Sequence, residues 1–199
     1  MSNIEFSVGI PSGELTGYVN GEDVYIGSYI AQNVTGYSLQ NDQIWCVSPT
    51  SLAIQSSATY AVEPGIVGQT AFTLQQQNAI AGILSQYITG GNYSPTEQAI
   101  TAIANWYVAD PGLQVTGIDS SIISAAGVLA ANGLAGDYTV NPNIQFQTFV
   151  NADSQNFAND PSPPPVPIPG TLLLLFTAMI MALGILHGKK SALRWQRHN

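Results

Sequence analysis

The residues that could carry out chemistry in this chain are few, and their types exclude most catalytic mechanisms. The sequence has 199 residues, one cysteine (Cys46) and two histidines, His187 and His198. Its basic residues also lie close to the end of the chain, at Lys189, Lys190, Arg194 and Arg197. Residues 1–186 therefore hold no histidine, lysine or arginine. This excludes Ser-His-Asp and Cys-His nucleophile systems, lysine chemistry, arginine phosphate clamps and histidine metal sites, and leaves only carboxylate chemistry.

The carboxylates do not form a pattern that indicates catalysis or metal binding. All 12 Asp and Glu residues precede residue 161. Glu22-Asp23 could bind a cation, but it follows the turn signal Asn20-Gly21, so a solvated turn is expected. No spacing suggests a carboxylate pair for glycoside hydrolysis. We therefore predict a protein that is not an enzyme and has no cofactor and no metal site. Its acidic body would also repel nucleic acid, which excludes nucleic-acid binding.

The first third of the chain has the composition of β-strands separated by turns. Strands are expected in residues 1–10, 24–26 and 43–47, with turn signals at 20–21, 36 and 41–42. Residues 1–10 have neither a basic segment nor an apolar one, so they do not resemble a signal peptide. More strand and loop is expected in residues 50–68. The single cysteine rules out an intrachain disulfide.

The middle of the chain predicts three helices. The first carries apolar residues at helical spacing and ends at Gly90-Gly91. The second opens with a capping box at 94–97, with proline at the first helical position, and stops at 110–112. The third is expected to start after Asp119 and to end at Asn132-Gly133. Residues 144–150 alternate as a closing strand. The expected fold of residues 1–158 is therefore α+β, a β-rich domain with a three-helix segment.

The last part of the chain has a different composition and predicts a membrane anchor. Residues 159–170 are rich in proline and form a semi-rigid spacer. Residues 171–187 are the expected transmembrane helix. The run 171–186 is apolar apart from Thr171 and Thr177, and it would reach only about 24 Å of a hydrocarbon core about 30 Å thick. Residues 188–199 form a basic tail. Because positive residues prefer the cytoplasmic side, we expect the tail inside and the acidic body outside, with membrane lipid around the helix.

The order of these C-terminal parts resembles a known sorting signal. A proline motif, an apolar run and a basic end follow one another, and together they resemble the PEP-CTERM signal. The motif contains Val166, Pro167, Pro169 and Gly170. The membrane stop consists of Lys189, Lys190, Arg194 and Arg197. The resemblance implies recognition and cleavage by exosortase, a membrane cysteine protease. Ile168 stands where that family usually has a glutamate. The alternative is an ordinary tail-anchored helix with a proline hinge.

The body resembles a domain common among PEP-CTERM proteins, which is related to the thioester domains of bacterial surface adhesins. The resemblance spans roughly residues 24–150 and rests on Trp45-Cys46-Val47, the helix with Gln98 and Trp106, and 122–126. In those domains a cysteine sulfur displaces ammonia from a glutamine carboxamide, and a partner's amine can capture the acyl group.

The thioester residues are only partly present. Cys46 matches the cysteine position, with Ser48 in place of the following aspartate. When the helix is aligned on Trp106, Ala102 occupies the glutamine position. Gln98 lies one turn earlier on the same face, so it would need a shift of about 6 Å to reach the thiol. The candidate thioester is Cys46 with Gln98, and the alternative is a small buried cysteine in a strand.

The leading functional expectation is a non-enzymatic protein of the envelope or extracellular matrix, exported and sorted through its C-terminus. The alternatives are a thioester adhesin acting through Cys46 and an uncleaved tail-anchored protein of the inner membrane. Extracellular polysaccharide or other surface components are the expected partners of the body. A start site upstream of Met1 is the preferred account of the missing signal peptide.

Overall fold

The fold of the body is mixed α+β, as the sequence predicts. The computed structural model describes residues 3–11, 15–35, 43–48, 57–68, 70–90, 94–142 and 144–159. The sorting motif, the apolar run and the basic tail lie outside the described residues. Within the described ranges, no helix is long and apolar enough to cross a membrane.

Six strands close into a barrel in which every neighbouring pair is antiparallel. Around the barrel the order is β1 (Asn3–Gly9), β4 (Tyr29–Thr35), β5 (Gln43–Cys46), β9 (Phe157–Asn159), β8 (Gln147–Val150) and β6 (Ala58–Pro64). The first strand alternates so that Ile4, Phe6 and Val8 are buried, as expected for a strand with one face on the core.

Aromatic side chains fill the barrel. The ring of Phe6 stacks on Tyr60 with centroids 4.2 Å apart and meets Phe149 edge-on at 5.5 Å. Phe157 packs against Tyr29 at 5.4 Å. Because these residues come from five different strands, each pair joins parts of the chain that are far apart in sequence. Such pairs contribute about 0.5–1.5 kcal/mol each beyond their buried area.

A second sheet has three strands in the order β3 (Glu22–Ile26), β2 (Leu15–Val19) and β7 (Val115–Thr116). The predicted turn joins the first two, and both of its residues have positive φ, 52° at Asn20 and 90° at Gly21. This is the conformation that an Asn-Gly hairpin turn needs. The Asn20 side chain also accepts a hydrogen bond from the backbone of Gln114, which ties the hairpin to the segment before β7.

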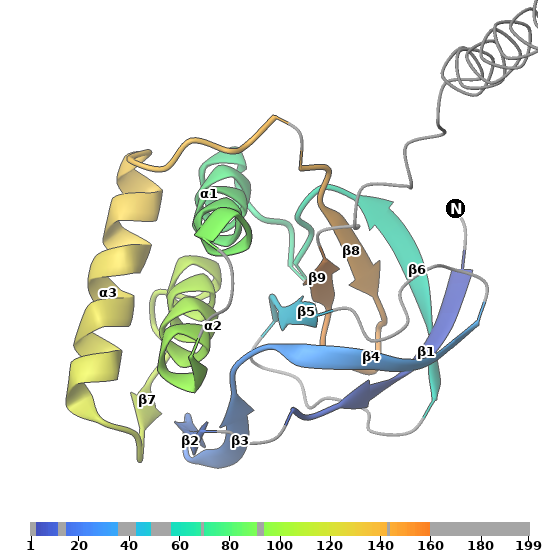
Figure 1. The fold of residues 1–199 in the computed structure, drawn as a ribbon, viewed down its shortest axis with the longest axis horizontal. Helices are drawn as coiled ribbons and strands as arrows, with labels where there is room; N and C mark the ends of the chain where they lie inside the picture. Colours follow the sequence, from blue (N-terminus) through green and yellow to red (C-terminus); the bar gives the residue numbers. More distant parts are fainter. Residues whose placement is uncertain are drawn as a thin grey trace, which may run out of the picture. The chain divides into compact units, whose positions relative to one another are not determined.

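Three helices gather beside the barrel strands in Figure 1: α1 (Leu74–Gly90), α2 (Pro95–Ala109) and α3 (Ser120–Ala135). The predicted capping box of α2 is present, since Ser94 and Glu97 bond each other's backbone N–H. The third helix runs on past its predicted stop to Ala135 and is capped by Gly136 at φ 83°. Gly133 instead marks close helix packing, because a Cβ there would lie 2.9 Å from a methyl group of Ile83.

The end of the body differs from the sequence prediction. The predicted strand 144–150 is shortened to β8 (Gln147–Val150), and an unpredicted strand, β9 (Phe157–Asn159), pairs with it and with β5. A three-residue strand has too few positions for its hydrophobic period to be recognised. It is β9 that completes the barrel beside Cys46.

Candidate functional site

The predicted thiol lies at the end of a barrel strand, against helix α2. Cys46 is the last residue of β5 and is 2% exposed. The indole N–H of Trp106, on α2, donates a hydrogen bond to the Cys46 carbonyl oxygen at 3.2 Å. The structure therefore brings together Cys46 and the Trp106 helix that the sequence resemblance paired with it.

The surroundings of Cys46 suppress the reactivity of its sulfur. Burial raises the pKa of the Cys46 thiol to about 12, although hydrogen bonds from the Ser48 backbone and the Trp106 side chain lower it in part. The thiolate is the nucleophilic form of cysteine. At neutral pH the Cys46 side chain is therefore a protonated, buried thiol, as the alternative of a small buried cysteine predicted.

Ser48, at the position where the sequence resemblance would place an aspartate, makes a structural connection. Its hydroxyl accepts a hydrogen bond from the Asn156 backbone N–H at 2.6 Å, and the Val47 N–H donates to the Asn156 carbonyl at 2.9 Å. These bonds fasten the segment after β5 to the loop before β9. A serine therefore helps to close the barrel beside Cys46.

Gln98, the other predicted thioester residue, is engaged with a different part of the body. Its side-chain oxygen accepts a hydrogen bond from the hydroxyl of Ser28 at 2.8 Å. Ser28 is fully buried between β3 and β4. The bond connects the start of α2 to the strand turn. One helical turn further along the same face, Ala102 is buried. Its side chain is a methyl group and has no carboxamide with which a thiol could react.

Asn105 is a buried polar residue that sequence reasoning missed. It is 0% exposed, and both polar atoms of its side chain lack a hydrogen-bond partner within the described residues. A buried polar group without a partner costs about 1–3 kcal/mol. The available signal was an asparagine in a run of buried Ala and Ile residues immediately before Trp106. A carboxamide is thus present on α2, seven residues after Gln98 and three after Ala102.

The two tryptophans of the body belong to the core. Trp45 and Trp106 are both buried, and Trp45 meets Tyr87 of α1 edge-on at 4.5 Å. Among the residues that the structure describes, no three His, Cys, Asp or Glu side chains are grouped so that they could hold a metal ion. The residues predicted to form the sorting motif and membrane stop fall outside this part of the chain.

Comparison with known proteins identifies the fold. No protein-family model matches the chain, and no curated protein is recognisably similar in sequence. Two solved structures are similar. The N-terminal thioester domain of a surface protein from Clostridium perfringens matches with a TM-score of 0.53 and 11% identity, covering 80% of this chain and 99% of that one. The N-terminal domain of the Streptococcus pyogenes pilus tip adhesin Cpa matches with a TM-score of 0.52 and 16% identity, covering 81% and 94%.

The fold of the body is similar to that of the thioester domain from Clostridium perfringens and of the adhesin domain from Streptococcus pyogenes. This agrees with the resemblance seen in the sequence around Cys46 and Trp106. At such low identity the likeness concerns the fold alone, so the chemistry of Cys46 must be judged from its own surroundings. The Cys46 thiol is buried, Gln98 is hydrogen-bonded to Ser28 instead, and Ala102 occupies the aligned glutamine position.

Proposed function

We propose that this chain is an exported, non-enzymatic protein of the bacterial surface, sorted through a PEP-CTERM-like C-terminal signal. The observation that carries the proposal is the order of the C-terminal parts: proline motif, apolar run, basic tail. The thioester-domain fold of the body supports it, because both similar structures are N-terminal domains of a surface protein or a pilus adhesin. Surface components or extracellular polysaccharide would be the partners of the body.

The charge distribution supports an outward-facing body. Every acidic residue precedes the apolar run and every basic residue follows it. Moving a lysine or arginine to the bilayer centre costs about 2.5–3.5 kcal/mol even on the mild insertion scale. Lys189, Lys190 and Arg194 would therefore hold the tail on the cytoplasmic side, and membrane lipid would surround residues 171–187 before processing.

An exosortase-type membrane protease would then release the body from its anchor. Pro167 and Pro169 fix φ and remove N–H donors, which favours the extended backbone that protease clefts accept. We expect the mature protein in a competent host to end near Pro169 and to lack Arg194 and Arg197. Residue 168 is the position to vary, because Ile168 stands where the PEP-CTERM signal usually has a glutamate.

C-terminal peptide mapping of surface-extracted protein tests the proposal. The wild-type chain should yield no tail peptide, whereas a Pro167→Ala, Pro169→Ala variant should stay anchored with its tail intact. An Ile168→Glu variant serves as the matched control and should be cleaved at least as well as wild type. Tail peptides in wild-type protein from a host with a working exosortase would replace the sorting proposal with an uncleaved tail anchor.

A thioester adhesin acting through Cys46 is the second candidate. It is favoured by the fold and by the position of Cys46 against α2. A thioester with Gln98 would lower the intact mass by one ammonia, and the deficit would vanish in both Cys46→Ser and Gln98→Ala. An intact mass equal to that of the unmodified chain would leave Cys46 as a core residue.

A further inference from the structure

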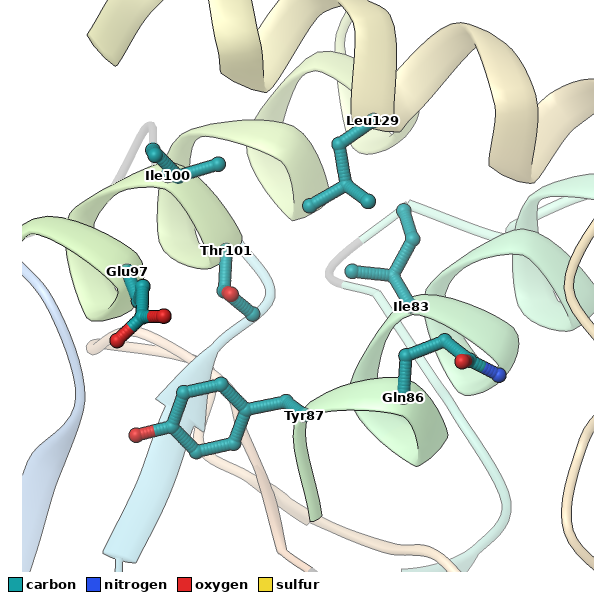
Figure 2. Close-up of a pocket in the computed structure, with 7 residues that line it drawn as sticks. All are labelled: Ile83, Gln86, Tyr87, Glu97, Ile100, Thr101 and Leu129. Carbon is teal, nitrogen blue, oxygen red and sulfur yellow. The ribbon is translucent and has the colours of Figure 1, made fainter. Parts of the chain in front are cut away.

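A pocket of about 220 Å³ opens between the three helices, and its walls are mainly apolar. Figure 2 shows Ile83 of α1, Ile100 of α2 and Leu129 of α3 around it, with Tyr87 and Glu97 at one side. For comparison, an apolar cavity of about 150 Å³ in another protein is large enough to bind benzene. The pocket therefore has room for one aliphatic side chain.

An exposed valine projects from the helix that forms one wall of this pocket. Val128 is 59% exposed, and it precedes Leu129 in the chain. Neighbouring residues of a helix lie about 100° apart around its axis, so Val128 faces solvent while Leu129 lines the pocket. The exposed positions on either side of Val128 are the smaller Ser124 and Ala131. The exposed side of α3 and the mouth of the pocket, here called the helical face, thus carry an apolar knob beside an apolar hole.

The three helices differ in charge from the rest of the body. Helices α1 and α3 contain no charged residue, and Glu97 is the single charged residue of α2. All other acidic residues of the chain lie outside these helices, and residues 1–186 contain no lysine, arginine or histidine to neutralise them. Two copies of the body therefore repel each other wherever their acidic surfaces meet. This repulsion is smallest at the helical face.

We propose that two copies of this chain associate through the helical face, with Val128 of each copy in the pocket of the other. A twofold dimer uses the same patch on both subunits, so that patch must contain both a projection and the recess that accepts it. Val128 and the pocket are neighbours in one patch, and an axis that passes between them pairs each knob with the opposite hole. A valine side chain is smaller than benzene, so the pocket can hold it. A cationic partner would instead be attracted to the acidic surfaces outside the helices.

The charged groups along α3 lie far enough from Val128 to permit this contact. Asp119 caps the N-terminus of α3, and Asp137 follows its C-terminal cap. Each is about 13 Å along the axis from Val128, which is longer than the Debye length of about 8 Å at physiological salt. Glu97, at the rim of the pocket, is the carboxylate that opposes association. Hydrogen bonds from Ser94 hold the pKa of Glu97 below its ordinary value, so it is negatively charged at neutral pH.

Sedimentation velocity of the full chain in detergent micelles, over a series of protein concentrations, tests this proposal. Wild type should form a dimer. Val128→Ala should raise the dissociation constant roughly tenfold or more, because the dimer loses apolar burial at two sites. Val128→Glu should abolish the dimer, because it would place a charge in an apolar pocket. Leu129→Trp fills the pocket and should also abolish it. Glu97→Gln should strengthen the dimer roughly two- to fivefold, because it removes a like charge from each copy.

The control variants separate loss of association from loss of fold. Ile10 is an exposed apolar residue just after β1, 41% exposed, so Ile10→Glu should leave the dimer unchanged. Val128 is exposed, and glutamine can complete the capping box of α2, so Val128→Glu and Glu97→Gln should unfold in urea like wild type. A wild type that is monomeric at every concentration, or a dimer that survives in Val128→Glu, would overturn the proposal. An equal loss of the dimer in Ile10→Glu would assign association to another surface and would overturn it too.

Discussion

Helix α2 contributes to two regions whose ionisable side chains differ in burial and in charge. Toward its C-terminal end, Trp106 covers the buried thiol of Cys46, whose pKa is raised to about 12. At its first turn, Glu97 is exposed at the pocket, and its pKa is lowered by Ser94. The residue type with nucleophilic potential is thus neutral and closed off, whereas an ordinary capping residue is charged and accessible. The solvent accessibility and ionisation of a side chain, more than its residue type, decide which region can bind a partner.

The largest expected effect comes from removing the cover of Cys46. We expect Trp106→Ala to lower the free energy of unfolding by about 3–5 kcal/mol, the usual cost of truncating a buried aromatic side chain. It should also speed alkylation of Cys46 by iodoacetamide. Trp106→Phe is the control, since it keeps most of the apolar volume but loses the indole N–H. Urea denaturation and mass-detected alkylation measure both effects. Unchanged alkylation in Trp106→Ala would show that another group covers the thiol.

The buried thiol should also make stability fall in alkaline solution. The folded pKa of about 12 lies above the ordinary value near 9, so between these two values the unfolded chain has lost a proton that the folded chain retains. This contribution is complete below about pH 9 and declines by about 1.4 kcal/mol per pH unit above it. Urea denaturation at a series of pH values measures it. Burial also raises the pKa values of Tyr60 and Tyr107 above the ordinary value of 10.0, so the comparison is made between about pH 9 and 10. In that range Cys46→Ala should remove the slope, and an equal slope in the variant would assign it to other groups.

Substitution of Asn105 tests whether a water or ligand is bound to its buried carboxamide near the C-terminal end of α2. Replacing it with leucine, of similar size, removes two unpaired polar atoms, so we expect stability to stay equal or to rise by about 1 kcal/mol. Asn151→Leu is the contrasting control, because it breaks hydrogen bonds to Thr59 and Asp153 and should destabilise. Thermal unfolding compares the two. A loss above about 1 kcal/mol in Asn105→Leu would indicate a bound water or ligand at its carboxamide.

A small loss of stability is expected when the bond between Ser28 and Gln98 is removed. Ser28→Ala should cost about 1 kcal/mol, the net value of one hydrogen bond. It should leave the alkylation rate of Cys46 unchanged, because Trp106 and the Ser48 segment remain in place. Faster alkylation in this variant would mean that Gln98 helps to cover the thiol, and would connect the two regions of α2.

Much of the local structure was predictable because it depends on neighbours in the chain. The Asn20-Gly21 turn, the Ser94 capping box and the stop at Asp110 each depend on a few adjacent residues, and all appear as predicted. The end of α3 was not predicted correctly. Gly133 is a helix stop by local rules, but its closeness to Ile83 shows a tertiary use.

The sequence by itself determined the charge segregation and the chemistry that residues 1–186 lack, because both depend on composition alone. It also indicated that Cys46 and Trp106 belong to one region. The tertiary structure decided the rest. Barrel closure by β9, the raised pKa of Cys46 and the unpaired carboxamide of Asn105 all depend on long-range packing and desolvation. The pocket likewise exists only because three helices bring Tyr87, Glu97 and Leu129 around one space, and no local pattern encodes that distance.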